Sequence, residues 1–171
     1  WTLNAPERDG QMSEKTKLAD SGSQRLGEIG LNNFAPYLMN RIVGRYNDSL
    51  SKEMSSLGLT TPKMRSLAVL FVLDGIMIRD LAVYAVVKQS TLSRSLDALE
   101  SDGMVRRETD SIDSRATRVF LTEPGRAAFE SLWPRMAESY NRMFKGVGAD
   151  ERRAFVGTLH KMLSNIRHHE F

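Results

Sequence analysis

The sequence predicts a mainly α-helical protein with one small β-hairpin and a long helix toward each end. Three observations predict this class. Apolar residues recur at helical spacing over most of the chain, two short β-prone runs follow one another around residue 110, and turn residues separate the segments. At 171 residues the chain is long enough for one domain with an added helical layer, but not for two full domains.

The first 27 residues differ in composition from the rest. They are polar and rich in Ser, Gly, Lys and Asp, so we expect a disordered arm over residues 1–27. The chain begins with Trp1 and not with Met, so we expect either that its natural start is missing or that the chain was processed. No apolar run approaches the roughly 18 to 20 residues that span a bilayer. We therefore expect no membrane contact and a cytoplasmic protein.

A long amphipathic helix is predicted after the arm. Apolar residues recur at every fourth position from Phe34 to Met54, which places them on one face of a helix. We expect this helix to end before Gly58.

Three shorter helices are predicted next. Thr60 or Thr61, just before Pro62, matches the capping pattern of a helix start, and we expect this helix to run to about Leu73. Asp74-Gly75 is a turn signal. The predicted order continues with a short third helix over 78–84, a turn over 85–88 and a fourth helix that ends at Gly103.

A β-hairpin and two further helices complete the predicted order. Met104–Glu108 and Thr117–Thr122 are β-prone, and the polar stretch between them is expected to form the loop. Thr122 also has the features of an N-cap for a long helix. Gly146-Val147-Gly148 ends that helix, and the last helix is expected from about Asp150 to Ile166.

Residues 78–121 have the order of a winged helix-turn-helix, which is a short helix, a tight turn, a second helix and a hairpin. Such a unit presents its second helix to the major groove of DNA. Here the second half of that helix carries Asp97, Glu100 and Asp102, so only its first half can approach phosphates without repulsion. Three leucines would face the core (Leu92, Leu96 and Leu99). The candidate DNA contacts are Lys88, Gln89, Ser90, Thr91, Ser93 and Arg94.

Four arginines gather around the predicted hairpin: Arg106, Arg107, Arg115 and Arg118. We expect Arg115 at the loop tip, where an arginine suits a narrow minor groove, and we place Asp113 with it in the candidate DNA-binding set. From residue 88 to residue 118 six cations face six acids, so the sidedness of the charge must attract DNA. The balanced charge leaves open an alternative, a winged helix that binds protein and not DNA.

Five short motifs then resemble a known family. In order they are Asp80-Leu81-Ala82, Ser90-Thr91-Leu92-Ser93-Arg94, Leu96-Asp97-x-Leu99-Glu100-x-x-Gly103-Met104-Val105-x-Arg107, Asp113-x-Arg115 and Leu121-Thr122-x-x-Gly125. This collinear set is typical of the MarR (multiple antibiotic resistance regulator) family, and the resemblance covers about residues 34–167. It implies a homodimer with interlocked first and last helices, a recognition helix in each major groove and a wing in each flanking minor groove. It also implies a regulator often released from its operator by a small aromatic or lipophilic effector.

Three positions depart from the family pattern. Ser114 stands where the wing usually has a second basic residue, Val86-Val87 lacks the usual turn glycine, and Lys88 replaces the usual N-cap residue. We expect the first departure to weaken wing contacts. The other two leave the start of the recognition helix open, with Ser90 as an alternative cap.

The predicted organisation assigns residues 59–122 to DNA binding, and residues 28–58 and 123–171 to dimerisation. We expect a repressor that acts as a homodimer on a pseudo-palindromic operator of double-stranded DNA. The candidate dimer interface consists of Phe34, Leu38, Phe155, Leu159, Met162 and Ile166. The candidate site for a small aromatic or phenolic effector consists of Met39, Arg41, Met64 and Arg65, although such methionines are more often simply core residues.

No pattern in the sequence points to catalysis or to a cofactor. It has no Gly-rich phosphate loop, no nucleophile elbow and no spaced acid pair, so we expect no enzyme activity. The absence of cysteine excludes disulfides and thiolate metal sites. His168 and His169 are adjacent and do not share a helix face, so we expect no metal site there.

Overall fold

The computed structural model describes residues 25–166, and its contacts divide the chain into two parts after Arg41. Most of the expected N-terminal arm and the pair His168-His169 lie outside the described residues. Each part is described by itself. The first contains α1 (Leu26–Ile29), the 3-10 helix η1 (Leu31–Asn33) and the first residues of α2 (Ala35–Ser56). The last two residues of the expected arm belong to α1.

Helix α2 is the long amphipathic helix that the sequence predicts. It is 22 residues long and ends before Gly58, which has a φ of 65°. Leu50 and Met54, near its C-terminal end, are buried in the core of the second part. The helix therefore anchors itself to the core through its last turns.

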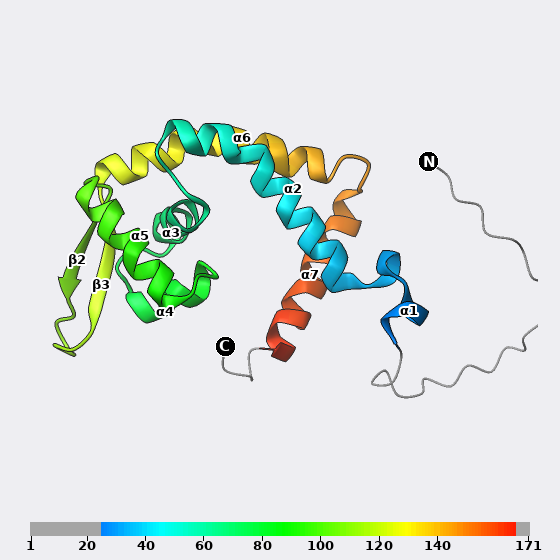
Figure 1. Ribbon diagram of the computed structural model, residues 1–171, viewed down its shortest axis with the longest axis horizontal. Helices are drawn as coiled ribbons and strands as arrows, with labels where there is room; N and C mark the ends of the chain where they lie inside the picture. Colours follow the sequence, from blue (N-terminus) through cyan, green and yellow to red (C-terminus); the bar gives the residue numbers. More distant parts are fainter. Residues whose placement is uncertain (1–24, 167–171) are drawn as a thin grey trace, which may run out of the picture. The chain divides into compact units, whose positions relative to one another are not determined.

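The next segment folds in the predicted order of a winged helix-turn-helix (Figure 1). Thr60 caps α3, since its side-chain oxygen accepts a hydrogen bond from the backbone N–H of Lys63. The predicted turn at Asp74-Gly75 and the predicted short third helix over residues 78–84 are both confirmed. The elements are α3 (Thr61–Val72), β1 (Ile76–Met77), α4 (Ile78–Tyr84), α5 (Gln89–Ser101), β2 (Val105–Thr109) and β3 (Thr117–Leu121).

Strand β1 extends the predicted hairpin to a three-stranded antiparallel sheet with the order β1-β3-β2. Ile76 pairs with Val119, on the strand that also pairs with β2. The preceding turn brings Gly75 so close to the Phe120 ring that a Cβ there would lie 2.7 Å from a ring carbon. Because its φ is also 72°, glycine is required at this position.

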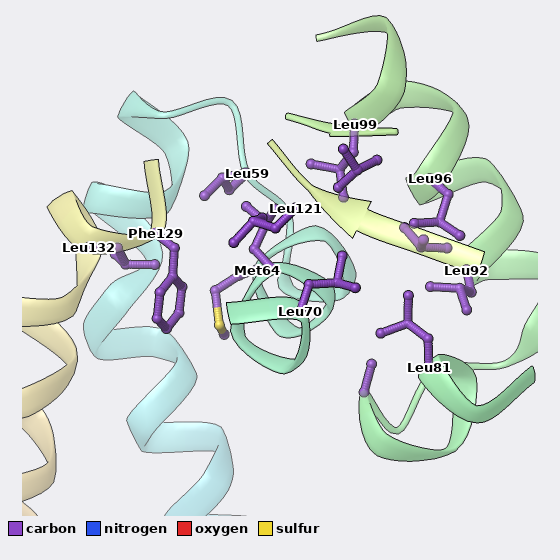
Figure 2. Close-up of a cluster of buried hydrophobic side chains, with 14 of the residues drawn as sticks. Leu59, Met64, Leu70, Leu81, Leu92, Leu96, Leu99, Leu121, Phe129 and Leu132 are labelled. Carbon is purple, nitrogen blue, oxygen red and sulfur yellow. The ribbon is translucent and has the colours of Figure 1, made fainter. Parts of the chain in front are cut away.

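One hydrophobic core joins α2, α3, α4, α5, the sheet and α6 (Glu123–Met143) (Figure 2). Leu92, Leu96 and Leu99 are fully buried, as their helical spacing predicts. Thr122 caps α6 by accepting a hydrogen bond from the N–H of Gly125 at 3.3 Å, which confirms the predicted cap. The last helix, α7 (Ala149–Ile166), buries no residue within the chain. No helix within residues 25–166 is long and apolar enough to cross a membrane.

Candidate nucleic-acid interface

Helix α5 begins at Gln89 with Lys88 in the N-cap position. The alternative start, capped by Ser90, is not adopted. The Lys88 side chain makes no capping hydrogen bond, and the first turn carries no acidic residue. The N–H groups of this turn are therefore available to an external acceptor, and the end of a helix that carries such groups favours an anion such as phosphate.

The two faces of α5 divide cleanly into buried and exposed residues. The leucines point into the core, and Ser95 is buried with its hydroxyl donating to the Thr91 carbonyl at 2.9 Å. The opposite face offers hydroxyl, amide, ammonium and guanidinium groups to solvent. All six predicted DNA contacts in the first half of the helix are exposed: Lys88, Gln89, Ser90, Thr91, Ser93 and Arg94.

The acids in the second half of α5 are paired with cations of neighbouring elements. Arg107 on β2 lies 2.9 Å from Asp97 and 2.5 Å from Glu100. The hydrogen bond from Arg107 lowers the pKa of Glu100, and the bond to Glu100 raises the pKa of Arg107. Asp102 lies 2.9 Å from Lys63 on α3. These pairs fix the C-terminal half of α5 to the sheet and to α3, while Arg94 has no ion pair within residues 25–166.

Asp110 organises the loop between β2 and β3, which is the wing tip. It is buried, and its Oδ1 accepts the N–H groups of Ile112 at 3.0 Å and Asp113 at 2.8 Å. Its other oxygen pairs with Arg118. The hydrogen bond from Asp113 is the largest of the contacts that lower the pKa of Asp110 to about 2. Asp113 in turn accepts the backbone N–H of Arg115 at 3.0 Å.

Three of the four wing arginines have an acidic partner in the chain, two of them partly buried and the third, Arg106, at the surface. Arg107 is paired as described, Arg118 pairs with Asp110, and Arg106 pairs with Glu108 while it stacks 4.3 Å above the Phe120 ring. Arg115 is exposed and, in the described part of the chain, forms no ion pair. The equal numbers of cations and acids counted from the sequence thus correspond largely to specific ion pairs. Arg115 is the wing cation that remains available to bind DNA phosphates or another partner.

Ile112 is a residue of the wing that the sequence analysis missed. Its side chain is 92% exposed at the same loop as Arg115. A single isoleucine in a polar loop belongs to no helical or alternating pattern, so the sequence does not predict whether it is buried. Its exposure depends on the loop conformation, which Asp110 and Asp113 stabilise by accepting backbone N–H groups. Proteins that bind the minor groove frequently insert an apolar side chain such as isoleucine between base steps.

The predicted dimer residues remain accessible in the single chain. Leu38, Phe155, Met162 and Ile166 are between 37% and 47% exposed, and Phe34 and Leu159 are half-buried. Phe34 and Leu38 belong to the part that ends at Arg41.

The predicted effector residues differ in their surroundings. Met64 is only 4% exposed and belongs to the hydrophobic core. Arg65 donates a hydrogen bond of 3.4 Å to the carbonyl of Val86, in the turn before α5. Met39 is half-buried, and the Arg41 guanidinium lies 5.7 Å from the centre of the Tyr37 ring. Met39 and Arg41 belong to the first part of the chain, and Met64 and Arg65 to the second.

A buried helix face, an exposed polar helix face and a preorganised wing define a winged helix-turn-helix DNA-binding protein. The comparisons with known proteins agree. The family model described as "MarR family" matches residues 59–117. A MarR-family transcriptional regulator from Silicibacter pomeroyi is 58% identical and superimposes with a TM-score of 0.80 over 86% of this chain and 100% of its own.

Two curated relatives are also HTH-type transcriptional regulators. YdgJ of Bacillus subtilis is 33% identical over 66% of this chain and 69% of its own length. The repressor IacR of Pseudomonas putida is 28% identical over 82% of each chain. The chain belongs to the MarR family. It is accordingly a DNA-binding transcriptional regulator and not an enzyme, as the sequence predicts.

Proposed function

We propose that this regulator acts as a homodimeric repressor that reads a pseudo-palindromic operator with the first half of α5 and with the wing. The observation that carries the proposal is the sidedness of α5: its leucines are fully buried, while the six predicted DNA contacts at its N-terminal half are all exposed. In a two-fold dimer the two half-site centres lie about one helical turn, ~10 base pairs, apart.

Dimerisation is supported by the apolar side chains of α7. A helix that buries none of its residues within its own chain, yet exposes Phe155, Met162 and Ile166, leaves an apolar face unpaired. A second copy of the chain would cover that face. Sedimentation at micromolar concentration is expected to give twice the chain mass of 19.3 kDa.

The readout of bases is assigned to Arg94. Its guanidinium is exposed one turn after Ser90 and has no ion pair among the described residues, so it is available for the edge of a guanine. Arg94→Ala is expected to cost about 1–3 kcal/mol per half-site and to relax the preference at one base position. Fluorescence anisotropy with the selected operator and with single-base variants of it measures both effects.

The wing is assigned to the flanking minor groove. Arg115→Ala is expected to weaken binding to all sequences, most where the flanks are A·T-rich, and to reduce the salt slope by about one unit. Ile112→Ala tests the apolar contact and should leave the salt slope unchanged. Arg153→Ala is the matched control. Arg153 is an exposed arginine on α7, and it lies outside the proposed DNA-binding surface of α5 and the wing.

The two arginine variants together decide the DNA-binding surface. If operator affinity is unchanged in both, and circular dichroism shows the same helical content, then α5 and the wing do not read DNA. An interaction with a protein would then be the alternative function of this lobe.

Release by a small aromatic or phenolic effector is the second part of the proposal, and Arg65 supports it. Its guanidinium holds the Val86 carbonyl in the turn before α5, so an anionic ligand that recruited Arg65 would free this turn. A ligand acts only if it binds the two states unequally. Salicylate-like compounds are expected to raise the melting temperature and weaken operator binding in the native chain, and to do neither in Arg65→Ala.

A further inference from the structure

An open groove of about 610 Å³ lies where the end of α3, strand β1 and helix α4 meet. Its volume is within the usual range of roughly 300–1,000 Å³ for small-ligand pockets. None of the residues proposed above for DNA, effector or dimer contacts lines it. The lining residues are Leu73, Asp74, Gly75, Ile76, Asp80, Val83, Tyr84 and Arg118.

The apolar part of the groove is unusually accessible. Leu73 is 43% exposed, Val83 is 69% exposed and Tyr84 is 51% exposed. Val72, which precedes Leu73, is 75% exposed. Single exposed apolar residues are ordinary on a protein surface. Here three of them line one depression, where they can contact the same ligand.

The charge of the groove is negative, because its one cation is already engaged. Arg118 pairs with Asp110 and donates a hydrogen bond of 2.8 Å to the Gly75 carbonyl. Asp74 uses Oδ1 to accept the backbone N–H groups of Leu121 at 2.7 Å and Gly75 at 3.1 Å, and its Oδ2 accepts no hydrogen bond from residues 25–166.

Asp80 is only weakly neutralised. The nearest cation to its carboxylate is Arg79 at 3.6 Å, and the two side chains are 48% and 73% exposed. A surface pair of this kind contributes little. Two carboxylates, an aromatic ring and three aliphatic side chains therefore line one depression.

We infer that this groove binds a lipophilic cation, a molecule whose positive charge is carried on aromatic or aliphatic groups. The carboxylates of Asp74 and Asp80 and the ring of Tyr84 attract the charge, and the apolar side chains accommodate the body of the molecule. The same carboxylates repel an anion. This ligand class is the opposite of the phenolic or carboxylate effector proposed above, and the inference does not depend on that effector.

The test compares two probes of nearly the same shape and opposite charge. Calorimetric titration of the full chain with tetraphenylphosphonium is expected to show one saturable site per chain. Tetraphenylborate is expected to bind at least about tenfold more weakly, because the carboxylates repel it. Equal binding of the two probes, or no saturable binding of the cation, would overturn the inference.

Isosteric variants locate the site. Asp74→Asn keeps the oxygen that accepts the Leu121 N–H, and Asp80→Asn likewise removes only charge. Each is expected to weaken binding of the cation roughly three- to tenfold, and Tyr84→Ala by a similar factor. Glu130→Gln, which removes an exposed acid of α6, is the matched control and should bind normally.

Two further outcomes would also overturn the inference. One is an unchanged affinity in the Asp74→Asn/Asp80→Asn double variant with intact helical content. The other is a change of oligomeric mass in Val83→Glu by sedimentation, which would show that a second copy of the chain occupies this groove.

Discussion

Val86 adopts a backbone conformation that a β-branched side chain disfavours. Its φ is 53°, and it ends α4 in a Schellman motif, in which the N–H of Val87 donates to the Ala82 carbonyl and that of Val86 to the Val83 carbonyl. The end of α5 has the same motif with Gly103 at the equivalent position and a φ of 69°. The chain thus contains a strained version and a relaxed version of one turn.

Val86→Gly is therefore expected to raise the free energy of unfolding by about 0.5–1 kcal/mol, since relief of left-handed strain exceeds the extra entropy of glycine. Little burial is lost, because Val86 is 76% exposed. The reciprocal control, Gly103→Ala, should lower stability by about 1 kcal/mol. Urea unfolding at one fixed protein concentration measures both, and a loss of stability in Val86→Gly would show that the valine makes a favourable contact.

Asp110 is the residue whose charge is expected to make stability depend on pH. Its pKa is lowered from 3.8 to about 2, so the folded state favours the carboxylate. A lowered pKa contributes stability above the unfolded pKa and loses it as the pH falls through the folded pKa. Asp110→Asn keeps an oxygen for the N–H groups of Ile112 and Asp113 but removes the charge.

The variant is expected to melt below the native protein at pH 7, and the difference should shrink as the pH falls from about 4 to about 2, the two ends of that pKa shift. Differential scanning calorimetry across this range measures it. A difference in melting temperature that stays constant from neutral to acid pH would show that the hydrogen-bond geometry, and not the charge, stabilises the wing.

At the scale of elements, the helices and the hairpin could be predicted because their signals are local. Capping threonines, turn glycines and helical periodicity lie within a few residues of the boundary that they define. The starts of α3 and α6 and both ends of α4 agree with them, whereas α6 ends at Met143, before the predicted Gly146. Strand β1 was missed because two residues are too few to show an alternating pattern.

The sequence could predict that the candidate DNA contacts are exposed, but not which side chains around them form pairs. The sequence identifies the polar face of α5, because buried leucines at helical spacing define the opposite face. The number of charged residues in the wing can be counted from the sequence, but the ion pairs that they form cannot be predicted from it. Arg107 with Glu100, and Arg118 with Gly75, become neighbours only when the sheet forms.

Helix α6 packs closely against the residue that precedes β2. A Cβ added at Gly125 would lie 2.0 Å from the Met104 carbonyl oxygen, which is backbone and cannot rotate away. Gly125→Ala is therefore expected to cost about 1–3 kcal/mol, as overpacked cores do. Ala127→Ser, at an exposed position two residues later, should stay within about 0.5 kcal/mol. Equal stability of the two variants in urea would show that α6 can shift away from Met104.

At the scale of the whole molecule, the sequence predicts which faces lack a partner within the chain. Phe155, Leu159, Met162 and Ile166 follow at spacings of four, three and four residues, so they share one face of α7. The single chain leaves three of these four at least 37% exposed. The length of α7 and its apolar face can be predicted because they depend only on the residues of that helix. The partner that covers this face cannot be predicted in the same way, because it is not encoded by the local pattern.

The apolar face of α7 is expected to control both the mass of the protein and its affinity for an operator. Phe155→Glu/Ile166→Glu places two charges on that face and should reduce the sedimenting mass to the 19.3 kDa of one chain. Each lobe would then bind one half-site, and operator affinity should fall roughly 10²- to 10⁴-fold because the linkage between the two half-sites is lost.

The control is Lys161→Glu, which adds negative charge at another exposed position of the same helix and should leave mass and affinity nearly unchanged. Circular dichroism checks that the lobe stays folded, as expected from a core to which α7 contributes no buried residue. A double variant that still sediments as a dimer would place the interface elsewhere. A monomer that bound the full operator as tightly as the native protein would show that the two recognition helices act independently.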